Sequence, residues 1–248
     1  MTPKSGLAPH AGGNGISRAA IAENSLIAKL PAQELAEFFA RAEKVSIALR
    51  EVLFEFNEPF QRVLFPTTGM GSLVTMLNDG TSFEAMTVGR EGFMALPLFH
   101  GISVARCKGI CLIEGEFYEM KSADFLTLLA IAPGLNAALH RYSQFSSEAI
   151  AQTAACNGIH LIEQRCARWL LITADAVGRN DFNLTQEFLS QMLAVRRPGV
   201  TVAIGALERQ GLIEHRYGRV SIVDAEGLKK VACECYSTIT EKARELLS

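Results

Sequence analysis

Apolar and polar residues alternate along this chain in two different rhythms. Between residues 20 and 42 the apolar positions follow a helical spacing, with Pro31 at a junction between two short helices. From Val45 to Met120 short β-rich runs alternate with turn signals such as Asn78-Asp79-Gly80. Short strands separated by regular turns predict an antiparallel sandwich or barrel.

Helical spacing returns after Met120, with a short helix over residues 121–132 and a long one over residues 133–157. Asn157-Gly158 is expected to end the long helix. One continuous apolar stripe runs along it, formed by Leu135, Leu139, Tyr142, Phe145, Ala149 and Thr153. We interpret the stripe as the seam of a parallel homodimer, and the alternative is that it packs on the β domain of its own chain.

A further helix begins near residue 160 and stops at Gly178, with its apolar positions again at helical spacing. The residue composition and pattern change at the junction between these two predicted helices, which places a domain boundary at about residues 157–160. The chain therefore predicts an α+β protein in four parts. These are a disordered tail over residues 1–19, a jelly-roll-like antiparallel β domain over 20–132, a dimerisation helix over 133–157 and a second, mainly helical domain over 158–248.

The segment from Met192 to Val223 decides between a hairpin and a helix with a function. Local propensity favours a turn at Pro198-Gly199 and a strand after it, because β-branched residues follow. The apolar residues Val200, Ala203, Ile204 and Leu207, however, fall at i, i+3, i+4 and i+7, which is a helix period. We therefore predict a helix in which Pro198 lies in the first turn.

Two short helices joined by a turn of three or four residues make a helix-turn-helix. Thr185 is a suitable N-cap for the first helix, and Gly211 is a stop signal for the second. The following residues predict a two-stranded wing with Tyr217-Gly218 at its tip. The alternatives are a plain helical packing unit, or an adaptor whose winged helix binds a protein.

The N-terminal end of the second helix carries the chemistry expected of a DNA reader. Arginine can grip a guanine edge or a phosphate, and a helix N-terminus attracts phosphate. If Arg197 reads a base, Arg196 holds a phosphate. The predicted DNA-binding residues are Thr185, Arg196, Arg197, Pro198, Thr201, His215 and Arg216.

Charge and cysteine content bear on the partners and the compartment of the protein. The net charge of −2 comes from the first part of the chain, whereas residues 185–220 hold five arginines against three glutamates. Six cysteines without C-x2-C spacing indicate reduced, buried thiols, and Cys233 and Cys235 are expected on different faces of a helix. The N-terminus has no signal-peptide pattern and no apolar run is long enough to span a membrane, so we expect a cytoplasmic protein.

With these parts in place, the chain resembles the Crp/Fnr family of bacterial transcription regulators over about residues 20–240. The similarity is strongest in "FLSQMLAVRRPGVTVAIGALERQGLI", "RCARWLL", "FPTTGMGSLV" and "TVGREGFMALPLF". The resemblance implies a homodimer that binds palindromic double-stranded DNA, acts on RNA polymerase and responds to a small-molecule effector in the β-roll. The effector itself is unknown, and the family implies no enzymatic activity.

Members that bind cyclic nucleotides carry a cassette in which a glutamate holds the ribose and an arginine with a hydroxyl holds the phosphate. Here Leu96 stands at the glutamate position, Arg106 is retained and Cys107 replaces the hydroxyl. The effector pocket implied by the resemblance is Phe93, Leu96, Arg106 and Cys107. Glu91 lies five residues too early to be taken as a substitute for the missing glutamate. We therefore expect that cyclic AMP is not the signal, and the alternative is a nucleotide sensor with a divergent cassette.

Metal cofactors are not expected from the sequence. No cysteine precedes Cys107, which excludes the N-terminal iron–sulfur cluster of some family members. The histidines lack H-x-H or H-x3-H spacing and look isolated. A β-barrel metal-dependent enzyme is the alternative from another class, and the clustered His and Glu ligands that it needs are missing.

Overall fold

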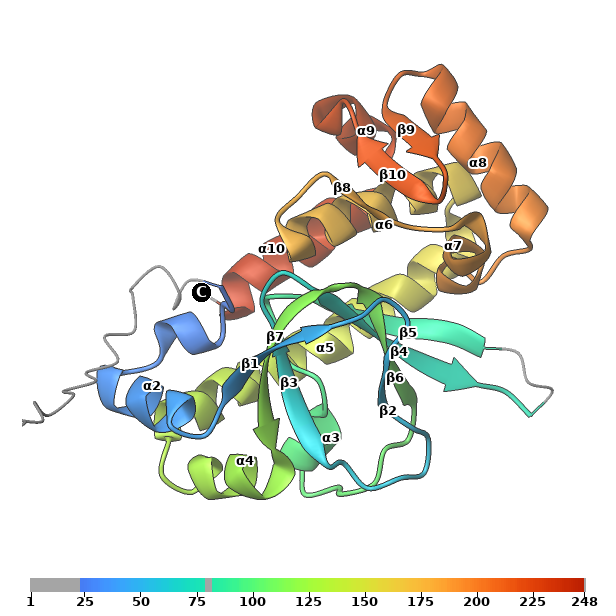
Figure 1. Cartoon of the computed structure of the whole chain (residues 1–248). Helices are drawn as coiled ribbons and strands as arrows, with labels where there is room; N and C mark the ends of the chain where they lie inside the picture. The colour runs from blue at the N-terminus through green and yellow to red at the C-terminus, as the bar shows by residue number, and fades with distance from the viewer. Residues whose placement is uncertain (1–22, 79–81, 248) are drawn as a thin grey trace, which may run out of the picture.

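The computed structural model describes residues 23–78 and 82–247. A β-roll occupies the lower part of Figure 1, a winged helical domain lies above it, and the long helix α5 runs behind both. The protein contains both helices and strands, and its N-terminal domain is built from antiparallel sheets. This confirms the predicted α+β fold class. The proposed tail over residues 1–19 lies outside the described residues.

The β-roll consists of two antiparallel sheets, with strand orders β1-β7-β3 and β2-β6-β4-β5. The two sheets enclose a core of aromatic and aliphatic residues, and the regular turns of the sequence separate their strands. The strands are β1 (Glu43–Ile47), β2 (Val52–Phe54), β3 (Arg62–Pro66), β4 (Met70–Met76), β5 (Ser82–Val88), β6 (Lys108–Ile113) and β7 (Gly115–Lys121).

Short helices cover the open edges of the roll. Pro31 is the N-cap of α2, so the expected junction between two short helices is confirmed. These helices are η1 (Ile27–Lys29), α2 (Ala32–Phe39), α3 (Leu96–Phe99) and α4 (Ser122–Leu129). Among the described residues no single helix is both long and apolar enough to cross a bilayer, and only α4 with α5, bent by 108°, meets that criterion jointly.

Helix α5 (Pro133–Ile159) packs against the β-roll of its own chain along the predicted stripe. Leu139 and Tyr142 are 0% and 1% exposed within a single chain. Tyr142 lies so close to Gly92 that a Cβ added there would stand 2.3 Å from its hydroxyl oxygen. The homodimer seam assigned to this stripe is therefore wrong, and the alternative that the stripe packs on the β domain holds. The helix also continues through Asn157 and Gly158, where we had expected it to end.

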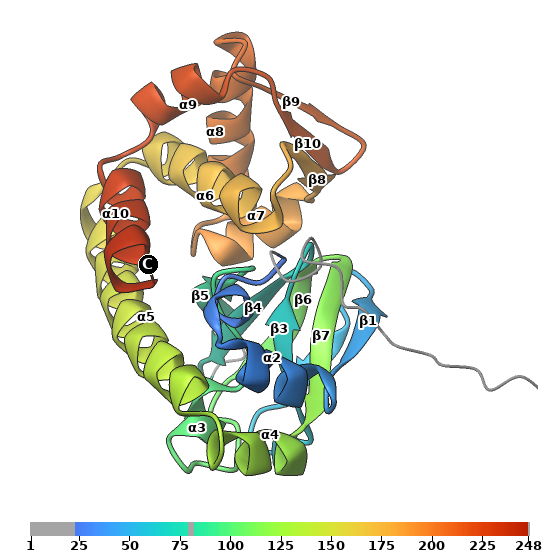
Figure 2. The same ribbon diagram turned by 90° about the vertical axis from the view of Figure 1, so that its left-hand side faces the viewer.

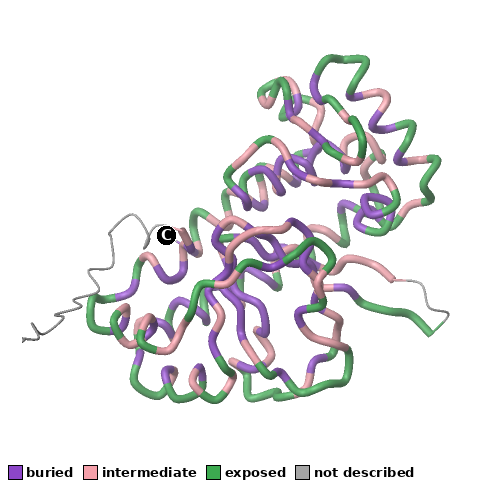
Figure 3. The backbone as a smooth tube through the Cα atoms, in the orientation of Figure 1, coloured by how far each residue is buried: buried purple, intermediate pink, exposed green. Residues whose placement is uncertain are grey.

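The C-terminal domain begins two residues after α5. Its core is apolar, and Met70, Leu112 and Ile113 of the β-roll belong to the same buried cluster, so the two domains are docked. The elements are α6 (Ile162–Val177), β8 (Asp181–Asn183), α7 (Gln186–Met192), α8 (Arg197–Arg209), β9 (Ile213–Arg216), β10 (Arg219–Ile222) and α9 (Ala225–Val231). Buried residues, drawn purple in Figure 3, continue through this junction.

The wing has three strands rather than the predicted two, in the order β8-β10-β9. The last helix, α10 (Cys235–Leu247), leaves the winged domain and packs along α5, as Figure 2 shows. Ile239 and Leu247 of α10 join the core of the β-roll. The chain therefore crosses between the two domains twice, once before α6 and once before α10.

Candidate DNA interface and interdomain cavity

The helix-turn-helix is built from a capped helix, a tight turn and a buried stripe. The Thr185 hydroxyl accepts a hydrogen bond from the Phe188 amide at 3.2 Å and so caps α7. Residues 193–196 form the turn, with Ala194 in the left-handed region at φ 51°. Helix α8 then begins at Arg197, with Pro198 in its first turn. The predicted helix, its start and its turn length are confirmed.

The apolar stripe of α8 is fully buried and orients the rest of the helix. Val200 and Leu207 are 0% exposed, and the opposite face is turned to solvent. The exposed face carries Arg197, Pro198, Thr201, Val202 and Arg209, and Arg196 is exposed directly before the helix. Within the described residues neither Arg196 nor Arg197 forms an ion pair, so both guanidinium groups are available to a ligand.

The exposed face also carries an apolar side chain beside the arginines. Val202 is 69% exposed, which is unusual for valine in a helix and suits an apolar contact with a base. The Thr201 hydroxyl donates a hydrogen bond to Gln186 Oε1 at 2.8 Å, which ties α8 to α7. Val202 lies two positions before Ile204 in the helix, so its exposure follows directly from the buried stripe.

The wing places its predicted residues on opposite sides of the sheet. Arg216 is exposed, whereas the ring of His215 is partly buried and its Nε2 lacks a hydrogen-bond partner in the described part of the chain. The His215 amide donates to Glu208 Oε1 at 3.0 Å, which joins β9 to α8. Tyr217, which was named only as the tip, is fully exposed at φ 51°, followed by Gly218 at φ 74°. Arg216 and Tyr217 are thus both exposed on the wing, as are Glu214 and Arg219.

Comparison with known proteins matches this domain. Residues 164–231 match the family model of the Crp-like helix-turn-helix domain. This segment is a Crp-like helix-turn-helix domain. No protein with a curated description matches the chain.

About three quarters of the chain has the fold of solved Crp/Fnr transcription regulators. It is similar to FixK2 from Bradyrhizobium japonicum, with a TM-score of 0.64 and 16% identity over 77% of this chain and 98% of that one. It is similar to the c-di-GMP responsive global regulator CLP from Xanthomonas campestris, with a TM-score of 0.62 and 15% identity over 77% and 99% of the two chains. A CRP-family regulator from Thermus thermophilus has a TM-score of 0.60 and 20% identity over 76% and 96%.

The four residues implied as an effector pocket lie in two segments of the β-roll, Phe93 and Leu96 in one and Arg106 and Cys107 in the other. Phe93 is 1% exposed in the core of the roll, and its ring lies 5.3 Å from that of Phe65. Leu96 begins α3, whereas Arg106 is exposed on the loop before β6. Cys107 follows on that loop, and burial raises the pKa of its thiol. None of the four lines the cavity described next.

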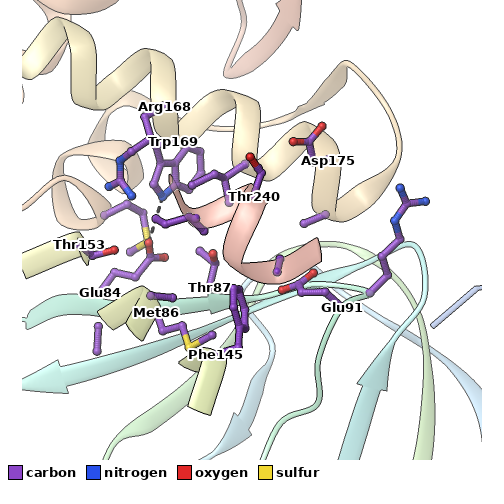
Figure 4. Close-up of a pocket in the computed structure, with 18 of the residues that line it drawn as sticks. Glu84, Met86, Thr87, Glu91, Phe145, Thr153, Arg168, Trp169, Asp175 and Thr240 are labelled. Carbon is purple, nitrogen blue, oxygen red and sulfur yellow. Dashed lines mark hydrogen bonds between the residues drawn. The ribbon is translucent and has the colours of Figure 1, made fainter. Parts of the chain in front are cut away.

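A cavity of about 230 Å³ lies where the β-roll, α5, the Crp-like domain and α10 meet. Figure 4 shows its lining side chains converging from these elements. Its lining includes Glu84, Met86, Thr87, Glu91, Phe145, Thr153, Arg168, Trp169, Asp175 and Thr240. A ligand here would touch the sensor and the DNA-binding domain at once. Sequence reasoning missed this site because its residues come from distant parts of the chain.

Glu84 is the polar centre of the cavity. Its carboxylate accepts hydrogen bonds from Trp169 Nε1 at 3.0 Å and from the Ser72 hydroxyl at 2.9 Å. Burial raises the pKa of Glu84 to about 7, although both hydrogen bonds act in the opposite direction. Because Trp169 belongs to α6 and Glu84 to β5, this hydrogen bond joins the two domains (Figure 4).

Two other ionisable side chains, Glu91 and Arg168, line the cavity. Burial also raises the pKa of Glu91, whose carboxylate accepts a hydrogen bond from the Gly89 amide at 2.9 Å. Arg168 is 5% exposed, and its Nε has no partner among the described residues. A buried guanidinium with a free donor favours a ligand that offers an acceptor.

Proposed function

We propose that this protein is a sequence-specific DNA-binding transcription regulator that acts as a homodimer on two-fold symmetric sites and responds to a small molecule. The exposed, unpaired arginines at the start of α8 carry the proposal, because a recognition helix enters the major groove N-terminus first. In this arrangement Arg197 contacts a base edge, and Arg196 contacts phosphate. Pro198 and Val202 offer apolar contacts, and Arg216 and Tyr217 of the wing lie beside the adjacent backbone. DNA bound in this way leaves the β-roll free to act on RNA polymerase.

The dimer is assigned to the outer face of α5 rather than to its buried stripe. A heptad register runs along that face, and every residue of its a and d positions is exposed in the single chain. These positions are Ala137, His140, Gln144, Ser147, Ala151, Ala154 and Gly158. Most of them are small, so two such helices can approach closely. A Cβ on Gly158 would meet nothing within 4 Å.

A charge at this seam tests the dimer without disturbing the core. Ala151→Glu is expected to give monomers in analytical ultracentrifugation and to abolish the preference for paired half-sites about 34–36 Å apart. The control Ala151→Ser keeps the side chain small and is expected to remain dimeric. An Ala151→Glu protein that stays dimeric would contradict the seam.

DNA binding itself is tested by selection from random DNA with the purified protein. We expect a two-fold symmetric consensus, and an affinity that falls steeply with salt because arginines replace counterions at phosphates. Arg197→Ala is predicted to weaken the selected site, as set out in the Discussion. An affinity that does not change with salt, and no enriched sequence, would favour the protein-binding adaptor.

We place the effector in the cavity between the domains. Arg168 Nε favours an acceptor or anionic group on the ligand, and Met86, Phe145 and Trp169 favour an apolar body. A ligand that contacts both β5 and α6 stabilises one arrangement of the two domains, which is how a small molecule would shift DNA affinity. CLP is described as responsive to c-di-GMP, so this fold serves signals other than cyclic AMP.

Two measurements test the effector site. A thermal-shift screen of small apolar acids is expected to give ligands whose stabilisation disappears in Thr153→Met, which narrows the cavity, and persists in the exposed-site control Thr127→Met. Titration calorimetry with cyclic AMP is expected to show no micromolar binding, because Leu96 and Cys107 cannot replace the cassette. Micromolar binding that is lost in Arg106→Ala would restore the nucleotide-sensor alternative.

A further inference from the structure

Four metal-ligating side chains meet where the chain crosses between the domains. Cys156 lies in the last turn of α5, and His160 is the C-cap residue of that helix, with its amide donating to the Cys156 carbonyl at 3.1 Å. Cys233 precedes α10 at the second crossing, and Cys235 is the first residue of α10. The ligand atoms of all four residues lie within 4.8 Å of one another, although the two pairs are far apart in sequence.

Two distances between these atoms match the edges of a tetrahedron around one ion. The Cys156 and Cys233 sulfurs are 3.5 Å apart, and the Cys235 sulfur is 3.6 Å from His160 Nδ1. Zinc bonds of about 2.3 Å to sulfur and about 2.0 Å to nitrogen give edges of roughly 3.8 Å for S···S and 3.5 Å for S···N. Ordinary thiol packing does not require a histidine nitrogen at one of the corners.

The surroundings of the cluster orient its ligands as a metal centre requires. His160 Nε2, the ring nitrogen turned away from the sulfurs, is 3.1 Å from Glu234 Oε1. A carboxylate on the outer nitrogen fixes the tautomer that leaves Nδ1 free to bind a metal. Gln152 Nε2 donates to the Cys235 sulfur at 3.1 Å, and the three thiols are at most 4% exposed.

We propose that Cys156, His160, Cys233 and Cys235 bind one Zn²⁺ in a structural Cys3His site. Three sulfurs and one imidazole are the donors of closed structural zinc sites, whereas harder cations prefer oxygen. Each thiol gives up its proton to the solvent when it binds the ion. The proposal replaces the sequence-based expectation of no metal. It does not depend on the proposed DNA binding.

Sequence reasoning missed the site for two physical reasons. Cys233 precedes α10 instead of lying within it, so Cys233 and Cys235 can point the same way, contrary to the helical interpretation. His160 looked isolated because its partners Cys233 and Cys235 lie on another element. The ion would clamp the first crossing to the second and so fix α10 and the Crp-like domain to the end of α5.

Metal analysis of the full-length protein, purified under reducing conditions, tests the proposal. We expect roughly one Zn²⁺ per chain, and less than about a fifth of that in Cys156→Ser and in Cys233→Ser. Cys107→Ser, which changes a thiol outside the cluster, is the control and is expected to keep its zinc. Wild-type protein without zinc, or with Cys156 and Cys233 joined in a disulfide, would overturn the proposal.

A milder variant covers the case in which the cysteine variants fail to fold. Glu234 is exposed, with 73% of its side chain accessible, so Glu234→Gln preserves the fold. Competition with a chelator is expected to show about 10-fold to 100-fold weaker zinc binding, because the support of His160 is lost. Glu241→Gln on the exposed face of α10 is the control. Equal affinities in both variants, or zinc X-ray absorption without about three sulfur ligands, would contradict the site.

Discussion

Helices α5 and α8 each bury one apolar stripe and expose the opposite face, but the two exposed faces differ in chemistry. The exposed face of α8 begins with arginines and proline, whereas that of α5 carries alanines, serine and glycine. Basic residues at a helix N-terminus suit DNA, and small residues suit a second helix at close range. The apolar stripe of a helix therefore shows which face is buried, and the chemistry of the exposed face indicates what the helix binds.

A carboxylate introduced into the buried stripe of α5 is expected to have the largest effect, because this stripe is the buried face of the helix. Leu139→Asp and Tyr142→Asp each place a carboxylate in the core of the β-roll, so we expect more than about 4 kcal/mol of lost stability. Urea unfolding followed by circular dichroism measures this loss. Thr127→Asp on the exposed face of α4, outside the proposed seam, is the control. Variants that remain folded as monomers would return the dimer seam to the stripe.

Glu84, in the cavity between the β-roll and the winged domain, is predicted to make stability depend on pH. Its pKa is about 7 in the folded protein against 4.5 for the free group, so the folded state keeps a proton that the unfolded state has lost. The free energy of unfolding therefore falls as the pH rises from about 4.5 to about 7, by up to about 3 kcal/mol, and is level above that range.

Glu84→Gln is expected to remove this part of the pH dependence. Denaturation at several pH values checks it, with the exposed Glu58→Gln as the matched control. An unchanged slope in Glu84→Gln would show that the Glu84 carboxylate stays ionised in the folded state.

The exposed arginines of α8 should separate base reading from phosphate contact. Arg197→Ala is expected to cost about 1–3 kcal/mol of binding and to flatten the preference at one position in each half-site. Arg196→Ala is expected to weaken all sequences alike and to reduce the salt dependence. Competition binding on selected and mutated sites measures both. If both variants lost the same affinity for every DNA sequence, base recognition would be assigned to Thr201 and Arg216 instead.

Thr185 gives the smallest predicted effect. Its hydroxyl caps α7, so Thr185→Ala should lower stability by about 1 kcal/mol. Thr185→Ser keeps the cap and is expected to retain wild-type stability. Thermal unfolding compares the two variants. If Thr185→Ala loses DNA affinity without losing stability, the hydroxyl contacts DNA as the sequence suggested.

The helix-turn-helix could be predicted from the sequence because its signals are local. The buried stripe of α8, the cap at Thr185 and the stop at Gly211 all lie within one short segment, and each has a direct physical meaning. The strand β8 was missed because three residues with two polar side chains carry no periodic signal.

The candidate sites between elements could not be predicted in this way. The cavity around Glu84 and the Cys/His cluster each join residues that are distant in sequence, and their geometry depends on how α10 returns to α5. The effector residues taken from the family resemblance remain a prediction, and they lie outside the cavity around Glu84. Phe93 fills the core of the roll, and Arg106 faces solvent.

The two crossings of the chain between domains have a mechanical consequence. Both lie at the end of α5, where the Cys156 and Cys233 sulfurs are 3.5 Å apart. On the other side, only non-covalent contacts such as the Trp169–Glu84 hydrogen bond connect the winged domain to the β-roll. The winged domain is therefore expected to rotate about the end of α5. If the Trp169–Glu84 hydrogen bond breaks, this rotation would move α8 and change the separation of the two recognition helices in the proposed dimer.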